Sequence, residues 1–419
     1  MFCSGEQQSV ELFGGFETTF VLLNSPTQSI FIWWFLYLTN KHTQKTPIFR
    51  LHLKNIHKIF TEMSHIKLLP PRQDIENKTI LKKVAEAHRF LAELKGVALS
   101  IPNESILIDT LVLQEAKESS AIENIVSTFD EIYQSDWSTG HFCSNAAKEV
   151  HSYARALKHG FSLVKNIGLL TNNHILEIHE IIEQNKAGYR KLPGTKLLNE
   201  NTKEIIYTPP QDYNEIVNLM ENLQEFINND DLSDLDSLIK MVIIHHQFES
   251  IHPFYDGNGR TGRIINILYL IKQDLLQLPI LYLSRYIIRN KVDYYRLLQE
   301  VRDTENWENW IMYMLEGVVQ TAKENIKIII GIRNAMQEYK QSIRASLPKI
   351  YSQDLLNNIF RHPYTKIEYI MNDLQVSRGT AVRYLSELTS LNLLEKQKIG
   401  RDNFYINKAL FDLLINKIN

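Results

Sequence analysis

Residues 252–263 read HPFYDGNGRTGR and hold three of the 16 glycines in this 419-residue chain. Gly257 and Gly259 have no Cβ, so their backbone N–H groups can approach an anion closely. The helix expected to begin near Arg260 directs the positive end of its dipole at the same place. The stretch therefore predicts a phosphate-binding loop at the start of a helix.

Charged side chains around the loop extend this prediction. Arg260 and Arg263 lie in the first turn of the helix, where two guanidinium groups can hold two phosphates of one polyphosphate. Asp256 would repel phosphates unless a cation lay between them, and Mg²⁺ is the usual cation in such sites. His252 can accept a proton near neutral pH. Together these residues predict nucleotidyl or phosphoryl transfer from a Mg²⁺-nucleotide to a hydroxyl group.

A simpler interpretation of the loop is a Gly-Asn turn between two buried helices, with Asp256 as a cap. Such a turn would not need His252, Phe254 or the two arginines, so we favour the phosphate site. Two other kinds of phosphate-binding loop are excluded. No Lys-Ser/Thr pair follows the glycines as in a Walker loop, and no strand precedes them as in a Rossmann fold.

The composition is that of an ordinary globular protein, with 44% hydrophobic and 22% charged residues. The formal net charge is -2, so the chain as a whole does not favour a polyanionic partner, although a local basic patch stays open. The two cysteines, Cys3 and Cys143, have neither disulfide-framework nor metal-knuckle spacing. They fit a reducing, cytoplasmic location.

Residues 1–62 differ from the rest and are left as an unassigned extension whose native status is open. Residues 30–38 read IFIWWFLYL, which is too short to cross a bilayer, and no positively charged segment precedes them as in a signal peptide. We therefore expect no membrane partner. Organised sequence begins just after Met63, which makes Met63 a candidate native start. Intact mass of the protein from its host would test that start.

Helical periodicity runs through most of the remaining chain, with Asn103 and Thr171 as predicted N-caps. Residues 235–249 are apolar on most sides, which is typical of a central helix. Residues 188–210 combine Gly, Pro, Asn and β-formers, and predict a short hairpin that turns at 199–202. The body is therefore expected to be all-α. The predicted divisions are a helical region at 63–165, a core at 166–340 and a C-terminal domain at 349–419.

The C-terminal domain, residues 349–419, has the element order of a winged helix-turn-helix. Three short helices, the third opened by Ser377, precede two strands that turn at 400–401. The candidate recognition helix carries Arg378 and Arg383. The wing adds both basic and acidic residues, so DNA binding and a role in packing or dimerisation are both left open.

The motif at residues 252–263 resembles the signature of the Fic (filamentation induced by cAMP) family, His-x-Phe-x-(Asp/Glu)-Gly-Asn-Gly-Arg-x-x-Arg, at every fixed position. The likeness extends from about Leu68 to the C-terminus. It includes HHQFESIHPF before the motif, GYRK and IIYTPP around the hairpin, and LKKVAEAHRFLAELKG in the helical region of large bacterial members. The resemblance implies an all-α Fic core with a β-hairpin flap, followed by the small winged-helix domain.

The resemblance also implies an activity. Most family members transfer AMP from ATP to a Ser, Thr or Tyr hydroxyl of a protein and release pyrophosphate. By this likeness His252 would be the general base, Asp256 would hold Mg²⁺ between the α- and β-phosphates, and Phe254 would anchor the loop in the core. The aspartate fits an AMP transferase, since relatives with a lysine at that place run different chemistry.

The phosphate contacts implied by the resemblance lie in the same motif. Gly257, Asn258 and Gly259 would form the anion hole, with Asn258 near the α-phosphate. Arg260 and Arg263 would bind the β- and γ-phosphates. ATP as co-substrate and Mg²⁺ as cofactor are the ligands that follow.

Two further groups of residues are assigned by resemblance. The flap around Ile205, Ile206 and Tyr207 corresponds to the strip where family members dock a target chain by backbone pairing. Tyr294 and Tyr295 sit where family members place aromatic groups near the adenine. Burial in a helix core is the equally weighted alternative for the two tyrosines.

A second motif bears on regulation. Residues 119–124 read SSAIEN and resemble the family's inhibitory pattern Ser/Thr-x-x-x-Glu-Gly/Asn. Ser119 and Glu123 lie one helical turn apart and share a face. By this likeness Glu123 would pair with Arg263 and occupy the γ-phosphate site. The alternative is an ordinary solvated glutamate on a helix surface.

The sequence leaves several functions open beside an autoinhibited adenylyltransferase that also modifies itself. One is a DNA-binding regulator whose core senses a nucleotide, although an intact His252 argues against it because sensing needs no base. Another is transfer or removal of a different nucleotide group, since phosphate contacts do not read the base. The target protein and a homodimer are also open.

Overall fold

The computed structural model describes residues 66–135, 140–198, 202–399 and 402–415. Before residue 66 it describes only β1 (Gln7–Gln8) and β2 (Phe20–Val21), which pair antiparallel. Contacts divide the chain into two units, residues 1–63 and 64–419. The described residues do not include the apolar stretch 30–38, Met63, the predicted turn at 400–401, or residues 199–201 of the hairpin turn predicted at 199–202.

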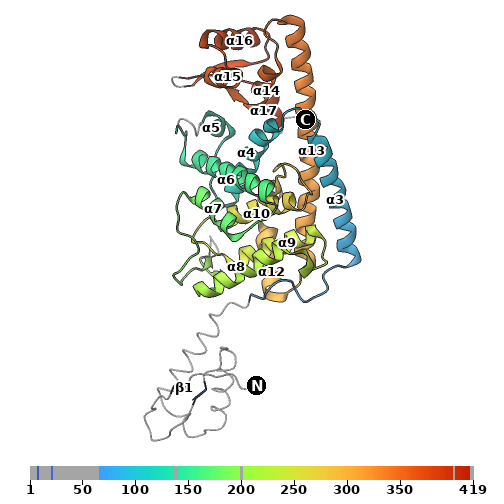
Figure 1. The fold of residues 1–419 in the computed structure, drawn as a ribbon, viewed down its shortest axis with the longest axis vertical. Helices are drawn as coiled ribbons and strands as arrows, with labels where there is room; N and C mark the ends of the chain where they lie inside the picture. The colour runs from blue at the N-terminus through green and yellow to red at the C-terminus, as the bar shows by residue number, and fades with distance from the viewer. Residues whose placement is uncertain are drawn as a thin grey trace. The chain divides into compact units, whose positions relative to one another are not determined.

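Helices make up most of the second unit, as Figure 1 shows. They are α3 (Lys78–Ala98), α4 (Glu104–Ile122), α5 (Phe129–Gln134), α6 (Asn145–Ile167), α7 (Asn172–Glu183), α8 (Tyr213–Asn228), α9 (Ser237–Ile251), α10 (Asn258–Lys272), α11 (Leu283–Arg289), α12 (Lys291–Thr304) and α13 (Glu308–Ser346). A short 3-10 helix, η2 (Asp230–Leu232), precedes α9. The predicted all-α body is confirmed.

Polar side chains start several of these helices where the sequence predicted. Asn103 accepts a hydrogen bond from the backbone N–H of Ser105 at the start of α4. Thr171 accepts one from His174 at the start of α7. Each cap satisfies a backbone donor that the first turn of a helix leaves without a partner.

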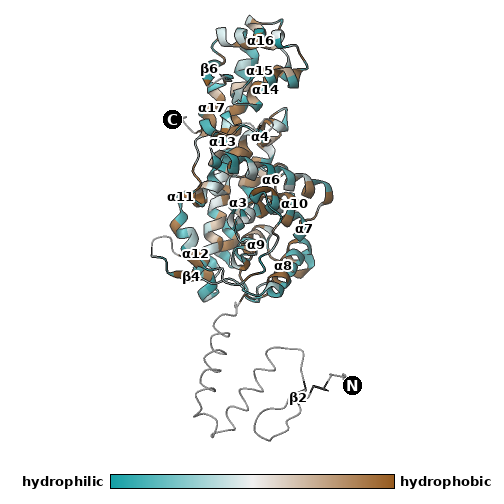
Figure 2. Cartoon of the chain, turned by 90° about the vertical axis from the view of Figure 1, so that its left-hand side faces the viewer, coloured by the Kyte–Doolittle hydropathy of each residue, from teal (hydrophilic) through white to brown (hydrophobic). Residues whose placement is uncertain are grey.

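The central helix of the body is α9, in which every residue from Leu238 to Ile251 is buried. It packs against α10, and α10 also contacts α6 and α7. Outer helices are amphipathic instead, and Figure 2 shows hydrophilic and hydrophobic residues side by side along α8. Among the described residues, none of the helices combines the length and apolarity needed to span a bilayer.

The hairpin predicted between residues 188 and 210 is present. Strands β3 (Leu197–Leu198) and β4 (Ile205–Tyr207) pair antiparallel, with Leu197 opposite Tyr207 and Leu198 opposite Ile205. The register shifts between the two β3 residues, as at a β-bulge.

The C-terminal segment follows the long helix α13, which spans 39 residues and packs along α3. It comprises α14 (Gln353–Arg361), β5 (Tyr364–Thr365), α15 (Ile367–Leu374), α16 (Arg378–Ser390), β6 (Glu395–Ile399), β7 (Asp402–Ile406) and α17 (Lys408–Leu414). The three helices and the hairpin occur in the predicted order, and Ser377 caps α16. The third strand, β5, and α17 were not predicted. β5 pairs with β7, so the sheet order is β5-β7-β6.

The C-terminal segment contacts the helix that carries Ser119. α14 and α17 both pack against α4 and α13. Asp109 on α4 forms ion pairs with Lys158 and with Arg361 of α14. Desolvation raises the pKa of the Asp109 carboxyl, but the two cations outweigh it and lower that pKa overall.

Candidate functional site

The motif loop joins the central helix α9 to α10. His252 ends α9 in a left-handed conformation with φ 49°, and Gly257 precedes α10 with φ 73°. The side-chain amide of Asn258 closes the loop, because its Oδ1 accepts from the N–H of Phe254 at 2.9 Å and its Nδ2 donates to the carbonyl of Phe254 at 2.9 Å. Asn258 therefore shapes the loop directly.

Stacked rings of Phe254 and His179 anchor the loop to the protein core. Phe254 is fully buried, and its ring stacks on His179 with 3.6 Å between ring centroids. Nε2 of His179 donates to the carbonyl oxygen of Asp256 at 3.0 Å. Burial, the largest cause, lowers the pKa of His179 and keeps the imidazole neutral. His179, a buried residue of α7, thus holds the loop in place.

Arg263 is buried and is paired with both residues of the predicted inhibitory motif. Its Nε donates to Oγ of Ser119 at 2.7 Å, and its Nη2 donates to the Ser119 carbonyl at 3.0 Å. Nη2 also lies 2.8 Å from Oε1 of Glu123. Burial is the largest single influence and opposes the charged guanidinium, but Glu123, Tyr294 and other nearby acidic groups together raise the pKa of Arg263.

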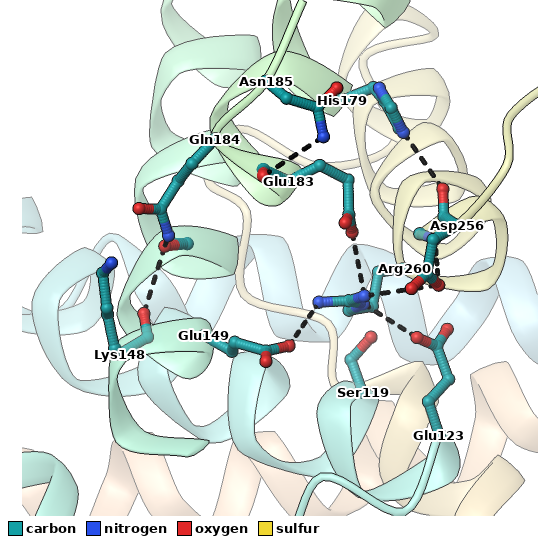
Figure 3. Close-up of polar contacts among 12 residues, drawn as sticks. Ser119, Glu123, Lys148, Glu149, His179, Glu183, Gln184, Asn185, Asp256 and Arg260 are labelled. Atoms are coloured by element: carbon teal, nitrogen blue, oxygen red, sulfur yellow. Dashed lines mark hydrogen bonds and ion pairs between the residues drawn. The ribbon is translucent and has the colours of Figure 1, made fainter. Parts of the chain in front are cut away.

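Arg260 is surrounded by four carboxylates, as Figure 3 shows, of which Asp256 is the most distant at 3.8 Å. Its Nε lies 2.8 Å from Oε2 of Glu123, its Nη1 2.8 Å from Oε2 of Glu149, and its Nη2 2.9 Å from Oε1 of Glu183. Desolvation opposes its charge, but these carboxylates raise the pKa of Arg260. Glu149 and Glu183 were missed from the sequence, since neither belongs to a motif and only the packing of α6, α7 and α10 brings them together.

Two of these carboxylates press against the glycines of the loop. A Cβ on Gly259 would lie 2.5 Å from Oε1 of Glu123, and a Cβ on Gly257 would lie 2.5 Å from Oε1 of Glu183. Both glycines are therefore needed for the close approach of an acidic group. In this structure the acidic groups are side chains of the protein itself.

The end of α4 explains why asparagine follows Glu123 in the motif. Asn124 has φ 64°, a left-handed conformation that Gly and Asn tolerate best. Its N–H donates to the carbonyl of Ala121 at 3.1 Å, and the N–H of Ile125 donates to the carbonyl of Ser120 at 3.1 Å. This Schellman arrangement holds Glu123 at the C-cap, where it faces both arginines.

The His252 side chain sits where a neutral imidazole is favoured. Burial is the main cause, and the charges of Arg190 and Arg302 add to it, so that the pKa of His252 is lowered to about 4. No hydrogen bond of ordinary geometry reaches Nδ1 from the residues that the structure describes. The imidazole can therefore accept a proton at neutral pH.

Asp256 is the acidic residue of the loop that is open to solvent. Its side chain is 80% exposed, and Oδ1 accepts a hydrogen bond from the N–H of Gly257 at 2.7 Å. Among the described residues, no three His, Cys, Asp or Glu side chains are grouped to hold a metal ion. A single carboxylate nevertheless fits Mg²⁺, which usually takes one or two carboxylates and completes its shell with phosphate oxygens and water. A cavity of about 300 Å³ adjoins this carboxylate, lined by His179, Glu183, Asn185, Ala187, Gly188, Tyr255 and Asp256.

The two candidate adenine contacts have different environments. Tyr294 is 1% exposed, and its hydroxyl lies 2.8 Å from Nε2 of His245. Its ring lies among those of Trp310 and Tyr313, which is the core environment that the sequence left as the alternative. Tyr295 is 47% exposed and is the one of the pair with ring surface available to a ligand.

The flap residues also divide in two. Ile205 and Ile206 are 53% and 46% exposed, although both are apolar. Tyr207 turns inward, its hydroxyl donates to the carbonyl of Ser250 at 2.9 Å, and the guanidinium of Arg302 lies 3.9 Å from its ring centroid. The isoleucines are thus available for docking, whereas Tyr207 anchors the strand.

Three family models match this chain. Residues 169–270 match the model of the Fic/DOC family, and residues 81–162 match the Fic/DOC family N-terminal model. Residues 335–410 match the C-terminal domain of SoFic-like protein adenylyltransferases.

Similar proteins agree with these matches. A probable protein adenylyltransferase of Aquifex aeolicus (strain VF5) is 36% identical over 97 residues, which is 23% of this chain and 27% of that protein. The protein adenylyltransferase Fic of Drosophila erecta is 36% identical over 47 residues, or 11% of this chain and 10% of that protein. The aligned segments therefore span less than a third of either curated relative.

A solved structure extends the likeness to most of the fold. The crystal structure of a Fic family protein from Desulfovibrio desulfuricans G20 superimposes with a TM-score of 0.50 and 19% identity. The superposition covers 81% of this chain and 98% of that one. At this identity the likeness speaks for the fold.

Proposed function

This chain is a member of the Fic/DOC family, and we propose that it is a protein adenylyltransferase. It would transfer AMP from ATP to a Ser, Thr or Tyr hydroxyl of a protein, itself included, and release pyrophosphate. The observation that carries the proposal is that His252, Asp256 and two buried arginines meet on one glycine-containing loop. The curated relatives with this activity match over only part of their length, so the activity is our inference.

His252 is the general base in this proposal. Its neutral imidazole takes the proton from the target hydroxyl, the hydroxyl oxygen forms a bond to the α-phosphorus, and the bond to pyrophosphate breaks. The lowered pKa keeps the unprotonated form dominant at pH 7. A free imidazole with a pKa near 6.5 would be partly protonated there.

Arg260 and Arg263 bind the phosphates in this proposal. Arg260 lies in the first turn of α10 and Arg263 in the second, and the dipole of this helix also favours negative charge at its start. Asp256 would hold Mg²⁺, which supplies positive charge to the phosphates when bound. The arginines stabilise the charge that develops on the departing pyrophosphate.

The occupied state of the arginines supports autoinhibition. Glu123 bonds both guanidinium groups and lies against Gly259, where a phosphate oxygen would need to come. Glu183 lies in the same way against Gly257 and bonds Arg260. Burial is the largest cause that raises the pKa of Glu183, so its position has a desolvation cost. ATP must displace at least Glu123 to gain both arginines.

The flap is the proposed docking edge for the target. Its strand β4 presents two exposed isoleucines and, among the described residues, pairs with β3 alone. An extended peptide can pair with such a strand through its backbone, with side-chain contacts adding selectivity. DNA binding by the C-terminal segment stays a prediction beside its alternative, a role in packing or dimerisation. Arg378 is paired with Glu368 at 2.9 Å, so part of the predicted recognition charge is balanced.

Intact-protein mass spectrometry tests the proposal. The full chain, its Glu123→Gly variant and a Glu123→Gly/His252→Ala double variant are incubated with Mg²⁺ and each of ATP, GTP, CTP and UTP. We expect a gain of one AMP unit with ATP, largest in Glu123→Gly and absent in the double variant. No gain in Glu123→Gly would contradict self-modification. An equal gain in the double variant would remove His252 as the base.

A further inference from the structure

The last turn of α9 carries His252, and its backbone needs partners from outside the helix. The last four backbone carbonyls of a helix have no hydrogen-bond donor within the helix. In this chain four consecutive carbonyls each accept a hydrogen bond from a side chain elsewhere. They are Glu249 from Nη2 of Arg302 at 3.2 Å, Ser250 from the Tyr207 hydroxyl at 2.9 Å, Ile251 from Nη2 of Arg190 at 3.4 Å, and His252 from Nε of Arg190 at 2.8 Å.

Arg190 ties this turn to both ends of the flap segment. It lies just before the hairpin and is 1% exposed. Its backbone N–H donates to the carbonyl of Pro253 at 2.8 Å, and its Nη2 also donates to the carbonyl of Pro210, beyond the hairpin. One buried guanidinium therefore connects the base of the flap with the backbone on either side of His252.

Arg302 and Tyr207 hold the same turn from the other side. Nε of Arg302 donates to Oγ of Ser250 at 3.0 Å, and its guanidinium stacks on the ring of Tyr207 at 3.9 Å. Tyr207 belongs to β4, so the docking strand itself is bonded to the helix end. A movement of β4 would therefore displace the Tyr207 hydroxyl and change its hydrogen bond to the carbonyl of Ser250.

The imidazole of His252 depends on this backbone for its direction. Its Nδ1 has no hydrogen bond of ordinary geometry among the described residues, and the group that favours a proton on the ring is the backbone of Glu249, which Arg302 also bonds. The left-handed φ of 49° is uncommon for a residue with a Cβ and persists only where the surroundings enforce it. The hydrogen bonds from Arg190 to the carbonyls of Ile251 and His252 stabilise this conformation.

We propose that Arg190, Arg302 and Tyr207 are positioning residues that aim His252 and couple it mechanically to the flap. The inference rests on the proposed function, in which His252 is the base and the flap docks the target. A target chain that pairs with β4 would displace Tyr207 and, through it, the backbone that orients the His252 imidazole. ATP binding would be largely separate, because the phosphates meet Arg260 and Arg263 on α10.

The charges that face His252 offer a second readout. Arg190 comes from the segment before the flap, Arg302 from α12 and Asp256 from the loop, while α9 contributes the backbone of Glu249. The two arginines add to burial in lowering the pKa of His252. Loss of the Arg190 charge should therefore move the acid limb of the pH–rate profile to higher pH, whereas loss of the Tyr207 hydroxyl should leave it in place.

The test uses the full chain in the Glu123→Gly background, with Tyr207→Phe, Arg190→Lys and Arg190→Met. Tyr313→Phe is the matched control, since its buried hydroxyl also donates to a backbone carbonyl, that of Asn290 at 3.2 Å. We expect Tyr207→Phe to lower the single-turnover labelling rate about fivefold and Arg190→Met about 100-fold, with Arg190→Lys between them. The ATP dissociation constant should stay within about twofold, and Tyr313→Phe should match its parent.

Two results would overturn the coupling. One is a Tyr207→Phe labelling rate equal to that of Tyr313→Phe. The other is a parallel loss of rate and ATP affinity in the folded Arg190 variants. A histidine-selective NMR titration makes the inference independent of activity. If the parent labels nothing, His252 ring resonances that are unchanged in Arg190→Met and Tyr207→Phe still refute the positioning role. Ring resonances that shift in these two variants and stay in place in Tyr313→Phe support it, while the proposed function alone fails.

Discussion

The carboxylate of Glu123 lies directly against Gly259, so that a Cβ on the glycine would be 2.5 Å from Oε1. The same carboxylate bonds Arg260 and Arg263 at 2.8 Å each. A bound phosphate would need the space beside Gly259 and hydrogen bonds from both arginines. In this structure the Glu123 carboxylate occupies that space and accepts those hydrogen bonds. The loop is thus complementary to an anion before any nucleotide arrives.

Replacement of Glu123 by glycine should open this site. We expect ATP affinity to rise about tenfold, equivalent to ~1.4 kcal/mol, because both arginines lose a competing partner. Glu123→Gln keeps the shape but loses the charge, so its affinity should fall between the wild type and Glu123→Gly. Calorimetry with a non-hydrolysable ATP analogue measures this. Equal affinities in all three proteins would remove Glu123 from the ATP site.

The same replacement should cost stability. Arg263 is 3% exposed, and without Glu123 its buried charge keeps only uncharged direct partners in Ser119. We expect the free energy of unfolding to fall by roughly 2 kcal/mol, less than for a fully buried pair because the Glu123 side chain is 23% exposed. Pyrophosphate should raise the melting temperature of Glu123→Gly more than that of the wild type. A variant that melts with the wild type and ignores pyrophosphate would contradict this account.

Glu183 and Glu149 should differ although both bond Arg260 at nearly the same distance. Glu183 also presses on Gly257, whereas Glu149 is an outer partner with 38% of its side chain exposed. In the Glu123→Gly background we expect Glu183→Ala to tighten ATP binding about fivefold further, and Glu149→Ala to change it less than twofold. Weaker binding in Glu183→Ala would show instead that Glu183 orients Arg260 for the phosphates.

Glu249 should make stability depend on pH. Burial raises its pKa to about 7, and its Oε1 is buried without a hydrogen-bond partner among the described residues. Between pH 4.5 and 7 the folded state keeps a proton that the unfolded state has released, so this carboxyl lowers stability as pH rises. As the pH rises from 4.5 to 8, the free energy of unfolding of Glu249→Gln should therefore increase by about 3 kcal/mol relative to that of the wild type.

Urea unfolding at several pH values measures that gain. The exposed Glu221 supplies a matched control, and Glu221→Gln should track the wild type throughout. A Glu249→Gln difference that stays constant with pH would mean that the carboxyl is ionised in the folded protein.

Local patterns were sufficient for the elements of the site. The N-caps at Asn103 and Thr171, the buried α9 and the hairpin all follow from short-range sequence signals, because capping, periodicity and turn chemistry act within a few residues. The pairing of Glu123 with Arg263 was reached by resemblance, and α4 does bring them together. Sequence patterns did not predict β5 or α17, which are short and gain their stability from packing on neighbouring elements.

By itself, the sequence determined the motif loop, its glycines and the charges that make it an anion site, because these lie within twelve consecutive residues. Only the tertiary structure decided which carboxylates fill that site, since Glu149 and Glu183 come from helices far from the loop in sequence. It also decided that Arg190 grips the backbone of His252, across 62 residues. Such contacts depend on how helices pack, and no local periodicity encodes the partner of a single buried charge.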